Sequence, residues 1–495
     1  MTPRVLDGTG GRAGRTIWLA PLLLGACAVG PDYHAPEASL TGTTGWKSAV
    51  EWRPAAPADQ AARGPWWEVY ADPELNRLEA LALQANTSLA IAAAQLDVAR
   101  AQATVANSAL VPEVDIGAQA SRARLSASRP TNGGTPTTRP AFQNTFQLPL
   151  TVSYELDLFG AVRRGAEAAR AGVEATAADL ESARLVISAE VANDYFALRE
   201  ADAEVAIDGR TVAALRRARA VIAERHRAGT ASGLDLAAED TTLANVEADL
   251  ADATLSRAQY ENALAVLVGV PAPEFHVAPV DTLTAFDTGT VLGVAVVPSH
   301  LLERRPDVAA AERRVAAANA AIGVATAAYF PALELTAAVG YESVAAPLVS
   351  APNLAWALGA ALSAPLFDAG RRHAGVEIAR AGHDIAVAQY RAVALNAFAE
   401  TEDALASLSL SAEAAAARAR AASAARQSLA LATRRYEVGV ASYLDVVSAQ
   451  QAQLGAERDA VRAQTRERLA TALLVKAVGG DYPRGTVPSA STAVP

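Results

Sequence analysis

The chain has 495 residues, enough for two or three ordinary domains or for one large elongated one. Hydrophobic residues make up 51% of it but aromatic residues only 5%, so much of the apolar fraction is alanine, which favours long, closely packed helices. The formal net charge of −10 argues against nucleic acid as a partner, because a nucleic-acid backbone requires clustered Lys and Arg.

The N-terminus has the three parts of a secretory signal. Three arginines precede an apolar run from Ile17 to Leu24, and two small residues, Gly25 and Ala26, follow the run. The run is shorter than the roughly 18 residues that a membrane-spanning helix needs, and no other segment comes closer. The sequence therefore predicts a signal peptide over 1–26 and excludes a helical inner-membrane protein.

Cys27, the only cysteine, follows this signal directly. A single cysteine allows neither an internal disulfide nor a thiolate cage for a metal. The tetrapeptide from Leu24 to Cys27 resembles the lipobox of bacterial lipoproteins, in which the cysteine is acylated and the acyl chains hold the mature N-terminus at a membrane. Ala28 after the cysteine, by resemblance to lipoprotein sorting, favours the outer membrane. The alternative is an ordinary signal peptide with an incidental cysteine.

The chain contains two copies of one plan. Six residues recur at a constant spacing: Arg225, Gly229, Ala231, Ser232, Leu234 and Asp235 in the first copy, and Arg435, Gly439, Ala441, Ser442, Leu444 and Asp445 in the second. Each copy begins with a helix, continues with an alternating stretch, and ends with two long helices joined by a glycine-containing turn. We therefore predict an internal two-fold repeat, with repeat 1 over 73–270 and repeat 2 over 301–480.

Before its long helices, each copy alternates apolar and polar residues with the period of two that is typical of strands, as from Phe146 to Leu158. The pattern predicts β-hairpins about 113–158 and about 332–366, with four strands in all. Each stretch is near the ~9–11 residues that cross a bilayer as a tilted strand, although a strand of a soluble sandwich is the alternative. Four strands cannot close a barrel alone, so membrane strands would require an oligomer.

The rest of each copy is predicted to form long helices. No proline interrupts residues 160–225, and apolar residues at every seventh position, as at Val173 and Leu180, are typical of coiled-coil packing. A helix of about 65 residues would extend about 100 Å, a length that suits the periplasm rather than a globule. The glycine-containing turns predict helical hairpin tips about 228–234 and about 438–444.

These motifs together resemble the outer-membrane factor family, the TolC-like channels, and within it the lipidated outer-membrane subunits of RND efflux pumps (OprM/NodT-like). Five stretches carry the likeness: Gly30–Tyr33, Trp66–Trp67, Asp72–Leu75, Leu301–Val308 and Tyr436–Asp445. The likeness runs from Cys27 to about Gly480.

The resemblance implies a mixed α and β membrane protein. Three chains would contribute four strands each to a shared twelve-stranded β-barrel, which a long α-helical periplasmic barrel continues. Residues 27–72 would form an N-terminal lipidated segment and equatorial region, 271–300 an equatorial linker, and 481–495 a flexible C-terminal tail. The protein is then expected in the cell outer membrane, lipid-anchored, with its helical part in the periplasm.

The function that the resemblance implies is the outer-membrane channel of a tripartite RND-type efflux pump, a passive exit duct for drugs or other toxic organic molecules. Its expected partners are a periplasmic adaptor (membrane fusion protein), an inner-membrane RND transporter and outer-membrane lipid, besides the other chains of a homotrimer. Two alternatives stay open, namely an outer-membrane channel for type I protein secretion and a periplasmic adaptor-like coiled-coil lipoprotein.

No catalytic motif accompanies these features. The sequence has no Walker-type Gly/Lys loop, no Gly-x-Ser-x-Gly elbow and no His-Glu-x-x-His pair, and its six histidines are scattered. We therefore predict that the chain is not an enzyme. We expect no catalytic residue, no cofactor and no metal site, and only a covalent lipid on Cys27.

By resemblance, gating is expected at the second tip. Arg435 and Tyr436 match positions that form closing polar links in the family, and Leu444 matches an apolar ring in the constriction. Relatives often carry an acidic ring four positions after Leu444, where this chain has Ser448. Asp445 is then either a substitute acid or a cap for the following helix.

Both tips are also expected to dock hairpins of the adaptor. The residues assigned to this role are Gly229 and Ser232 in the first tip, and Gly439 and Ser442 in the second. Plain turn and cap chemistry would explain the same residue types. Both roles can hold at once, because they use the same exposed backbone.

Overall fold

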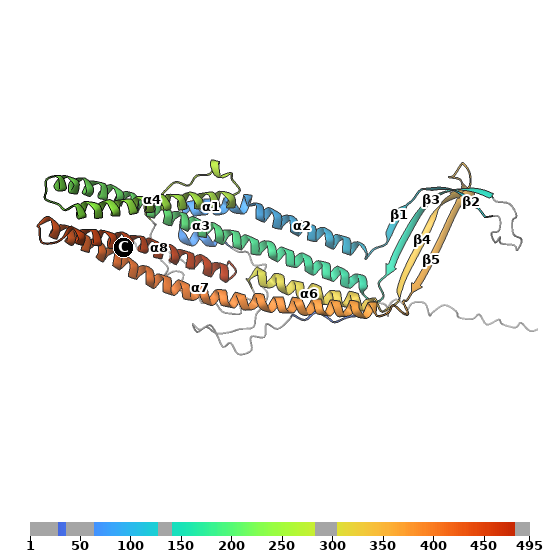
Figure 1. Ribbon diagram of the computed structural model, residues 1–495. Coiled ribbons are helices and arrows are strands. Elements are labelled where there is room, and N and C mark those ends of the chain that lie inside the picture. Colours follow the sequence, from blue (N-terminus) through green and yellow to red (C-terminus); the bar gives the residue numbers. More distant parts are fainter. Residues whose placement is uncertain (1–27, 36–63, 127–140, 283–303, 481–495) are drawn as a thin grey trace, which may run out of the picture. The chain divides into compact units, whose positions relative to one another are not determined.

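The computed structural model of the chain describes residues 28–35, 64–126, 141–282 and 304–480. The predicted signal peptide, Cys27 and the tail 481–495 lie outside the described residues, as do parts of 27–72 and 271–300. The described residues form two compact units. Unit 1 lies within 1–36, 98–174 and 312–388, and unit 2 lies within 37–97, 175–311 and 389–495. Figure 1 labels the elements of both units.

Seven helices are described across the two units. They are α1 (Pro73–Ala85), α2 (Thr87–Ser108), α3 (Ala161–Arg227), α4 (Gly233–Leu267), α6 (Pro306–Ala327), α7 (Arg371–Glu437) and α8 (Tyr443–Ala477), besides the short 3-10 helices η2 (Trp66–Tyr70), η3 (Ala272–Glu274) and η5 (Ala351–Asn353). α3 and α7 have 67 residues each, and neither contains proline, which would break the hydrogen-bond ladder. None of the described helices is both long and apolar enough to cross a membrane.

Unit 1 contains one antiparallel sheet, whose strands run side by side in Figure 1. Its strands are β1 (Glu113–Ile116), β2 (Gln119–Leu125), β3 (Ala141–Leu156), β4 (Ala332–Ser343) and β5 (Leu354–Ser363). Their order is β1-β3-β4-β5, and β2 also pairs with β3. The two predicted hairpin regions, far apart in the chain, thus meet where β3 pairs with β4.

β1 and β2 pair with β3 as if they were one interrupted strand. Both keep a single register, with Ile116 opposite Leu150 and Gln119 opposite Gln147. Between them the Gly117 N–H donates to the Pro149 carbonyl at 2.9 Å, but proline has no N–H with which to return the bond. The sheet is therefore four strands wide, and β1/β2 and β5 form its two edges.

The segment Gly30–Tyr33 binds to the helices of unit 1. The Arg164 guanidinium of α3 lies 2.8 Å from the Asp32 carboxylate. Gly30 has a φ of 109°, and a Cβ added to it would lie 2.5 Å from the Gly323 Cα of α6. Only glycine fits this close approach and this backbone conformation. The segment therefore ties α3 to α6 within unit 1.

The core of unit 2 packs α1 against three longer helices. Leu75 and Leu78 of α1 are fully buried in one cluster with Val191 of α3, Leu264 of α4 and Val475 of α8. Burial of each such side chain contributes roughly 1.5–3 kcal/mol to stability. The apolar positions of four helices thus meet in a single core.

Three short motifs of the sequence position α1 and α6 in unit 2. The Asp72 carboxylate caps α1 by accepting from the Leu75 N–H at 3.2 Å, and it also accepts from the Tyr195 hydroxyl at 2.6 Å. The buried Arg305 guanidinium donates to the Ala477 carbonyl at 3.1 Å and lies 2.7 Å from the Asp307 carboxylate. The remaining motif is Trp66, whose indole N–H donates to the Ser188 hydroxyl at 2.6 Å.

Candidate functional site

One face of the sheet in unit 1 is apolar and exposed. The most exposed of its large side chains are Ile116, Trp356 and Leu358, with 73–76% of their surface accessible. The register brings alternate residues of all strands to this face: Val114 and Ile116; Phe146, Leu148, Leu150, Val152, Tyr154 and Leu156; Leu333, Leu335, Ala337, Val339 and Tyr341; and Leu354, Trp356, Leu358, Ala360 and Leu362. An exposed apolar band of this height is typical of strands that face lipid.

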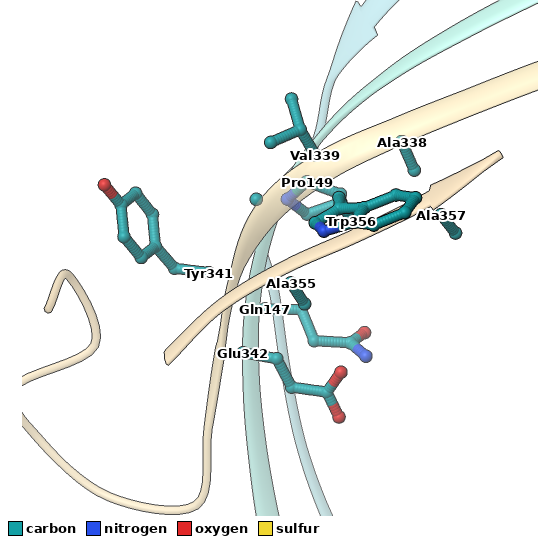
Figure 2. A pocket seen from close by; sticks show the side chains of 10 residues that line it. Gln147, Pro149, Ala338, Val339, Tyr341, Glu342, Ala355, Trp356 and Ala357 are labelled. Atoms are coloured by element: carbon teal, nitrogen blue, oxygen red, sulfur yellow. The ribbon is translucent and has the colours of Figure 1, made fainter. Parts of the chain in front are cut away.

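The opposite face of the sheet carries carboxylates and small side chains. Its carboxylates are Glu113, Asp115, Glu155, Glu334 and Glu342. No Lys or Arg belongs to this face in the described strands. Figure 2 shows Gln147 and Glu342 extending to one side of the sheet and Tyr341 to the other. The hollow drawn in Figure 2 is lined in part by Gly340. A Cβ added to Gly340 would lie 2.3 Å from the Leu148 carbonyl oxygen.

The first hairpin tip joins α3 to α4. Gly229 has a φ of 75°, a conformation that L side chains rarely adopt, and it ends α3. The Ser232 hydroxyl accepts from the Asp235 N–H at 3.1 Å, and the Asp235 carboxylate accepts from the Ser232 N–H at 3.1 Å. This reciprocal pair is a capping box that starts α4.

The second hairpin tip joins α7 to α8 with the same chemistry. Gly439 has a φ of 77°, the Ser442 hydroxyl accepts from the Leu444 N–H at 3.2 Å, and the Asp445 carboxylate accepts from the Ser442 N–H at 3.1 Å. Asp445 therefore caps α8 in the single chain. The side chains of Leu444 and Ser448 are exposed.

Tyr436 and Arg435, the other residues predicted at the gate, differ in their surroundings. The Tyr436 hydroxyl accepts from the Arg225 guanidinium at 3.2 Å, and the guanidinium carbon lies 5.6 Å from the centre of the tyrosine ring. Arg225 lies in the last turn of α3 and Tyr436 in the last turn of α7, so this contact joins the two hairpins. Arg435 is exposed, and its side chain makes no polar contact in the part of the chain that the structure describes.

A second contact between the hairpins involves Glu239 and Tyr443, which sequence reasoning missed. The Tyr443 hydroxyl of α8 donates to the buried Glu239 carboxylate of α4 at 2.7 Å, and the other carboxylate oxygen of Glu239 has no partner in the structure. Burial raises the pKa of Glu239, and burial also raises the pKa of Tyr443. Tyr443 packs with Val446 and Val447 in an apolar cluster at the second tip. Acid and phenol thus form a polar link inside an apolar tip.

A third contact between the hairpins is an ion cluster further along the same helices. The Arg458 guanidinium of α8 lies 2.6 Å from the Asp208 carboxylate of α3 and 2.7 Å from the Asp249 carboxylate of α4. Asp208 is almost fully buried. These three polar contacts join the two hairpins, together with a further one at 2.8 Å between the Arg462 guanidinium of α8 and the Glu204 carboxylate of α3.

Comparison with known proteins identifies the family. The chain matches the family described as Outer membrane efflux protein over residues 78–270 and 297–480, which is more than half of its length. The chain belongs to this family. Because the family consists of efflux channels rather than enzymes, the predictions of family and of a non-enzymatic role are confirmed.

Members of the outer membrane efflux protein family resemble the chain over nearly its whole length. It is 32% identical over 474 residues to the outer membrane protein OprJ of Pseudomonas aeruginosa, covering 94% of this chain and 95% of that one. It is 31% identical over 471 residues to the toluene efflux pump outer membrane protein TtgF of Pseudomonas putida, covering 93% and 95%. The solved structure of the CmeC outer membrane channel of Campylobacter jejuni matches with a TM-score of 0.80 and 25% identity, over 92% of this chain and 95% of that one.

Proposed function

We propose that three copies of the chain form a passive exit channel in the outer membrane, through which a tripartite RND-type pump expels toxic organic compounds and drugs. The observation that carries the proposal is the sheet of unit 1, which has one exposed apolar face and one acidic face. Its two edges, β1/β2 and β5, have no partner strand among the described residues.

The edges of the sheet are the reason to expect an oligomer. In lipid an unpaired backbone N–H or C=O costs several kcal/mol, so strands cross membranes only as closed barrels. A sheet four strands wide is too narrow to close on itself, since the smallest membrane barrels have about eight strands. Three copies joined from β5 to β1/β2 would make twelve strands, with the apolar face toward lipid and the acidic face toward the lumen.

The long helices would continue the barrel into the periplasm. Each chain supplies two helical hairpins, α3–α4 and α7–α8, in keeping with the internal sequence repeat. Six hairpins in a trimer would form the wall of a tunnel, with the tips at its inner end. An inner-membrane transporter would supply the energy, and a periplasmic adaptor would supply the connection.

The second tip is the proposed gate. Arg435 and Tyr436 would form closing links, Leu444 an apolar constriction, and Asp445 and Ser448 its polar neighbours. Untwisting of the α7–α8 hairpin away from α3–α4 would open the tunnel. The exposed backbone around Gly229, Ser232, Gly439 and Ser442 would receive the hairpins of the adaptor.

The expected substrates are small apolar or amphipathic organic molecules. TtgF is the outer membrane protein of a toluene efflux pump, and this chain is similar to TtgF over nearly its whole length. The lipid on Cys27 would tether the mature N-terminus to the outer membrane. The barrel itself spans the bilayer, so a Cys27→Ala variant is expected to lose acylation and to keep its trimer and its insertion.

Disulfide trapping tests the oligomer. In a Cys27→Ala background, pairs of cysteines placed in β5 and β1 should give covalent dimers and trimers on a non-reducing gel. The matched control is a pair at Leu150 and Val339, which lie opposite each other in β3 and β4 and should link only within one chain. Monomers alone from every β5–β1 pair contradict the trimer.

Gene deletion tests the transport role. Cells that lack the gene should accumulate dyes and drugs from a panel that also contains metal ions, and the intact gene should restore efflux. Accumulation of none of these compounds, together with loss of a secreted protein from the medium, would instead support a channel for type I protein secretion.

A further inference from the structure

In the described strands, the apolar face of the sheet in unit 1 carries only two charges. Arg122 and Arg124 of β2 belong to this face, because Arg122 lies opposite Asn144 and Arg124 opposite Phe142. All carboxylates of the described strands lie on the other face. Neither guanidinium has an ion-pair partner in the described part of the chain. Two unneutralised cations therefore share the face that is otherwise built for lipid.

The register puts both arginines at one end of the apolar band. On β3 the apolar band runs from Leu156 to Phe146. Arg122 lies opposite Asn144, two residues beyond the Phe146 end of this band. This end of the sheet leads to the β2–β3 and β4–β5 connections, whereas Leu156 leads to α3. An arginine is costly at the middle of a bilayer but costs almost nothing at its surface. With the apolar band in lipid, Arg122 and Arg124 would lie at the height of lipid headgroups.

The local geometry presents the two guanidinium groups together. Residues two apart on a strand are separated by about 7 Å, which brackets one phosphate group. The guanidinium carbon of Arg122 lies 5.4 Å from the centre of the Phe142 ring, a cation–π contact that holds it against the face of the sheet. Guanidinium groups bind phosphate oxygens through paired N–H donors, and more strongly than ammonium groups do.

We propose that Arg122, held in place by Phe142, and Arg124 bind the phosphate of a phosphorylated lipid in the leaflet at the loop end of the barrel. The inference rests on the proposed function, since it requires the apolar face to lie in lipid. Charge complementarity selects the headgroup, and the adjoining apolar band accepts its acyl chains. Each chain of a trimer would then hold lipid at this position on its outer surface.

Native mass spectrometry of the purified trimer tests the proposal. The probes are diphosphoryl lipid A, its monophosphoryl form and the same lipid without phosphate, each with and without inorganic phosphate as competitor. The trimer should retain the diphosphoryl form most strongly and the phosphate-free form least. Arg122→Gln/Arg124→Gln should weaken retention of the diphosphoryl form about thirtyfold, at roughly 1 kcal/mol for each of the two cations.

Two further variants make the result specific. Arg217→Gln removes one guanidinium charge from an exposed position of α3 and should leave retention unchanged. Arg122→Lys/Arg124→Lys keeps the charge and should retain an intermediate amount of lipid, which also covers the case that the double glutamine variant fails to fold. Equal retention by wild type and the glutamine variant, equal retention of all three lipids, or displacement by inorganic phosphate would each overturn the lipid site.

The readouts separate this inference from the proposed function. Trimer assembly, membrane insertion and drug efflux are measured on the same variants and should not change in Arg122→Gln/Arg124→Gln. Wild-type trimers that insert and export drugs but hold lipid without regard to phosphate would refute only the lipid site. A wild-type chain that forms no inserted trimer would refute both.

Discussion

The hydroxyl of Tyr443 donates a 2.7 Å hydrogen bond to the carboxylate of Glu239, and so joins the first turn of α8 to α4 over 204 residues of sequence. The pair lies at the tips where the proposed gate must move. Glu239 is buried in this arrangement and would meet water if the α7–α8 hairpin swung away. Opening and the ionisation of Glu239 are therefore coupled.

The first prediction is that opening increases with pH. Burial raises the pKa of Glu239 in the joined state, so that state holds its proton more tightly than an open state with the ordinary value near 4.5. Above that pKa of about 4.5 the carboxyl group loses its proton in the open state more readily than in the joined state. Raising the pH therefore favours opening. Single-channel recordings in planar bilayers should show more open time at pH 8 than at pH 5. Glu239→Gln should abolish the difference, and Asp252→Asn, an exposed acid of the same helix, should keep it.

Removing the phenol hydroxyl should loosen the gate at fixed pH. Tyr443→Phe leaves Glu239 without its donor while the ring still fills the apolar cluster. Leaving a buried polar group without its hydrogen-bond partner typically costs about 1–3 kcal/mol, so the ratio of open to closed states should rise roughly fivefold or more. Unchanged recordings from Tyr443→Phe would mean that the α4–α8 link does not resist opening.

Arg225 should matter more than its repeat counterpart for contacts within one chain. Arg225→Gln removes both the hydrogen bond to Tyr436 and the contact with its ring, whereas Tyr436→Phe removes only the hydrogen bond. The open time should therefore increase more in Arg225→Gln than in Tyr436→Phe. Arg435→Gln makes the same change of charge at a side chain without a described polar contact. An effect of Arg435→Gln as large as that of Arg225→Gln would indicate that Arg435 bonds to a neighbouring chain of the trimer.

The cap of α8 should be worth about 1 kcal/mol at the second tip. Ser442→Ala removes the hydroxyl that accepts from the Leu444 N–H. Amide hydrogen exchange in the first turn of α8 should become about fivefold faster, since 1.4 kcal/mol corresponds to a factor of ten. Ser448→Ala changes an exposed serine of the same helix and should leave the exchange as it was. Equal acceleration in both variants would show that the capping bond is not the cause.

The Arg458 cluster should stabilise the contact between hairpins only as a complete set. Arg458→Met leaves the buried Asp208 carboxylate without its cation, and such a loss typically costs about 3 kcal/mol or more. The double variant Asp208→Asn/Arg458→Met removes the charge as well and should recover most of that stability. Denaturant unfolding monitored by circular dichroism measures both changes. If the double variant is no more stable than Arg458→Met, the uncompensated charge of Asp208 is not the cause of the lost stability.

Local patterns in the sequence are sufficient to predict several elements. The alternation from Phe146 to Leu158 is visible without a partner strand, and β3 lies at Ala141–Leu156. The glycine and serine residues of the tips have helix-ending and helix-capping chemistry that depends on a few neighbours. Asp445, for which a cap and a gate role were both open, is engaged as a cap. Its role in a gate stays a prediction.

Contacts between distant segments had no such signal. In the sequence Arg225 stands out only as a repeated residue, and nothing marks Glu239 or Tyr443, because each partner lies more than 200 positions away. The interruption between β1 and β2 depends on Pro149 of the opposite strand, which the alternation of Val114 and Ile116 does not reveal. The motif Gly30–Tyr33 was recognisable by resemblance, but its contacts with α3 and α6 were not.

The sequence by itself thus determined the doubled plan, the alternating strands and the capped tips, since periodicity and turn chemistry act over a few residues. Only the tertiary structure decided which strands and hairpins pair, that Glu239 is buried beside Tyr443, and that Arg122 and Arg124 are the sole charges of the apolar face in the described strands. These properties arise from register and packing between segments far apart in the chain, where burial and the distance between charges are set.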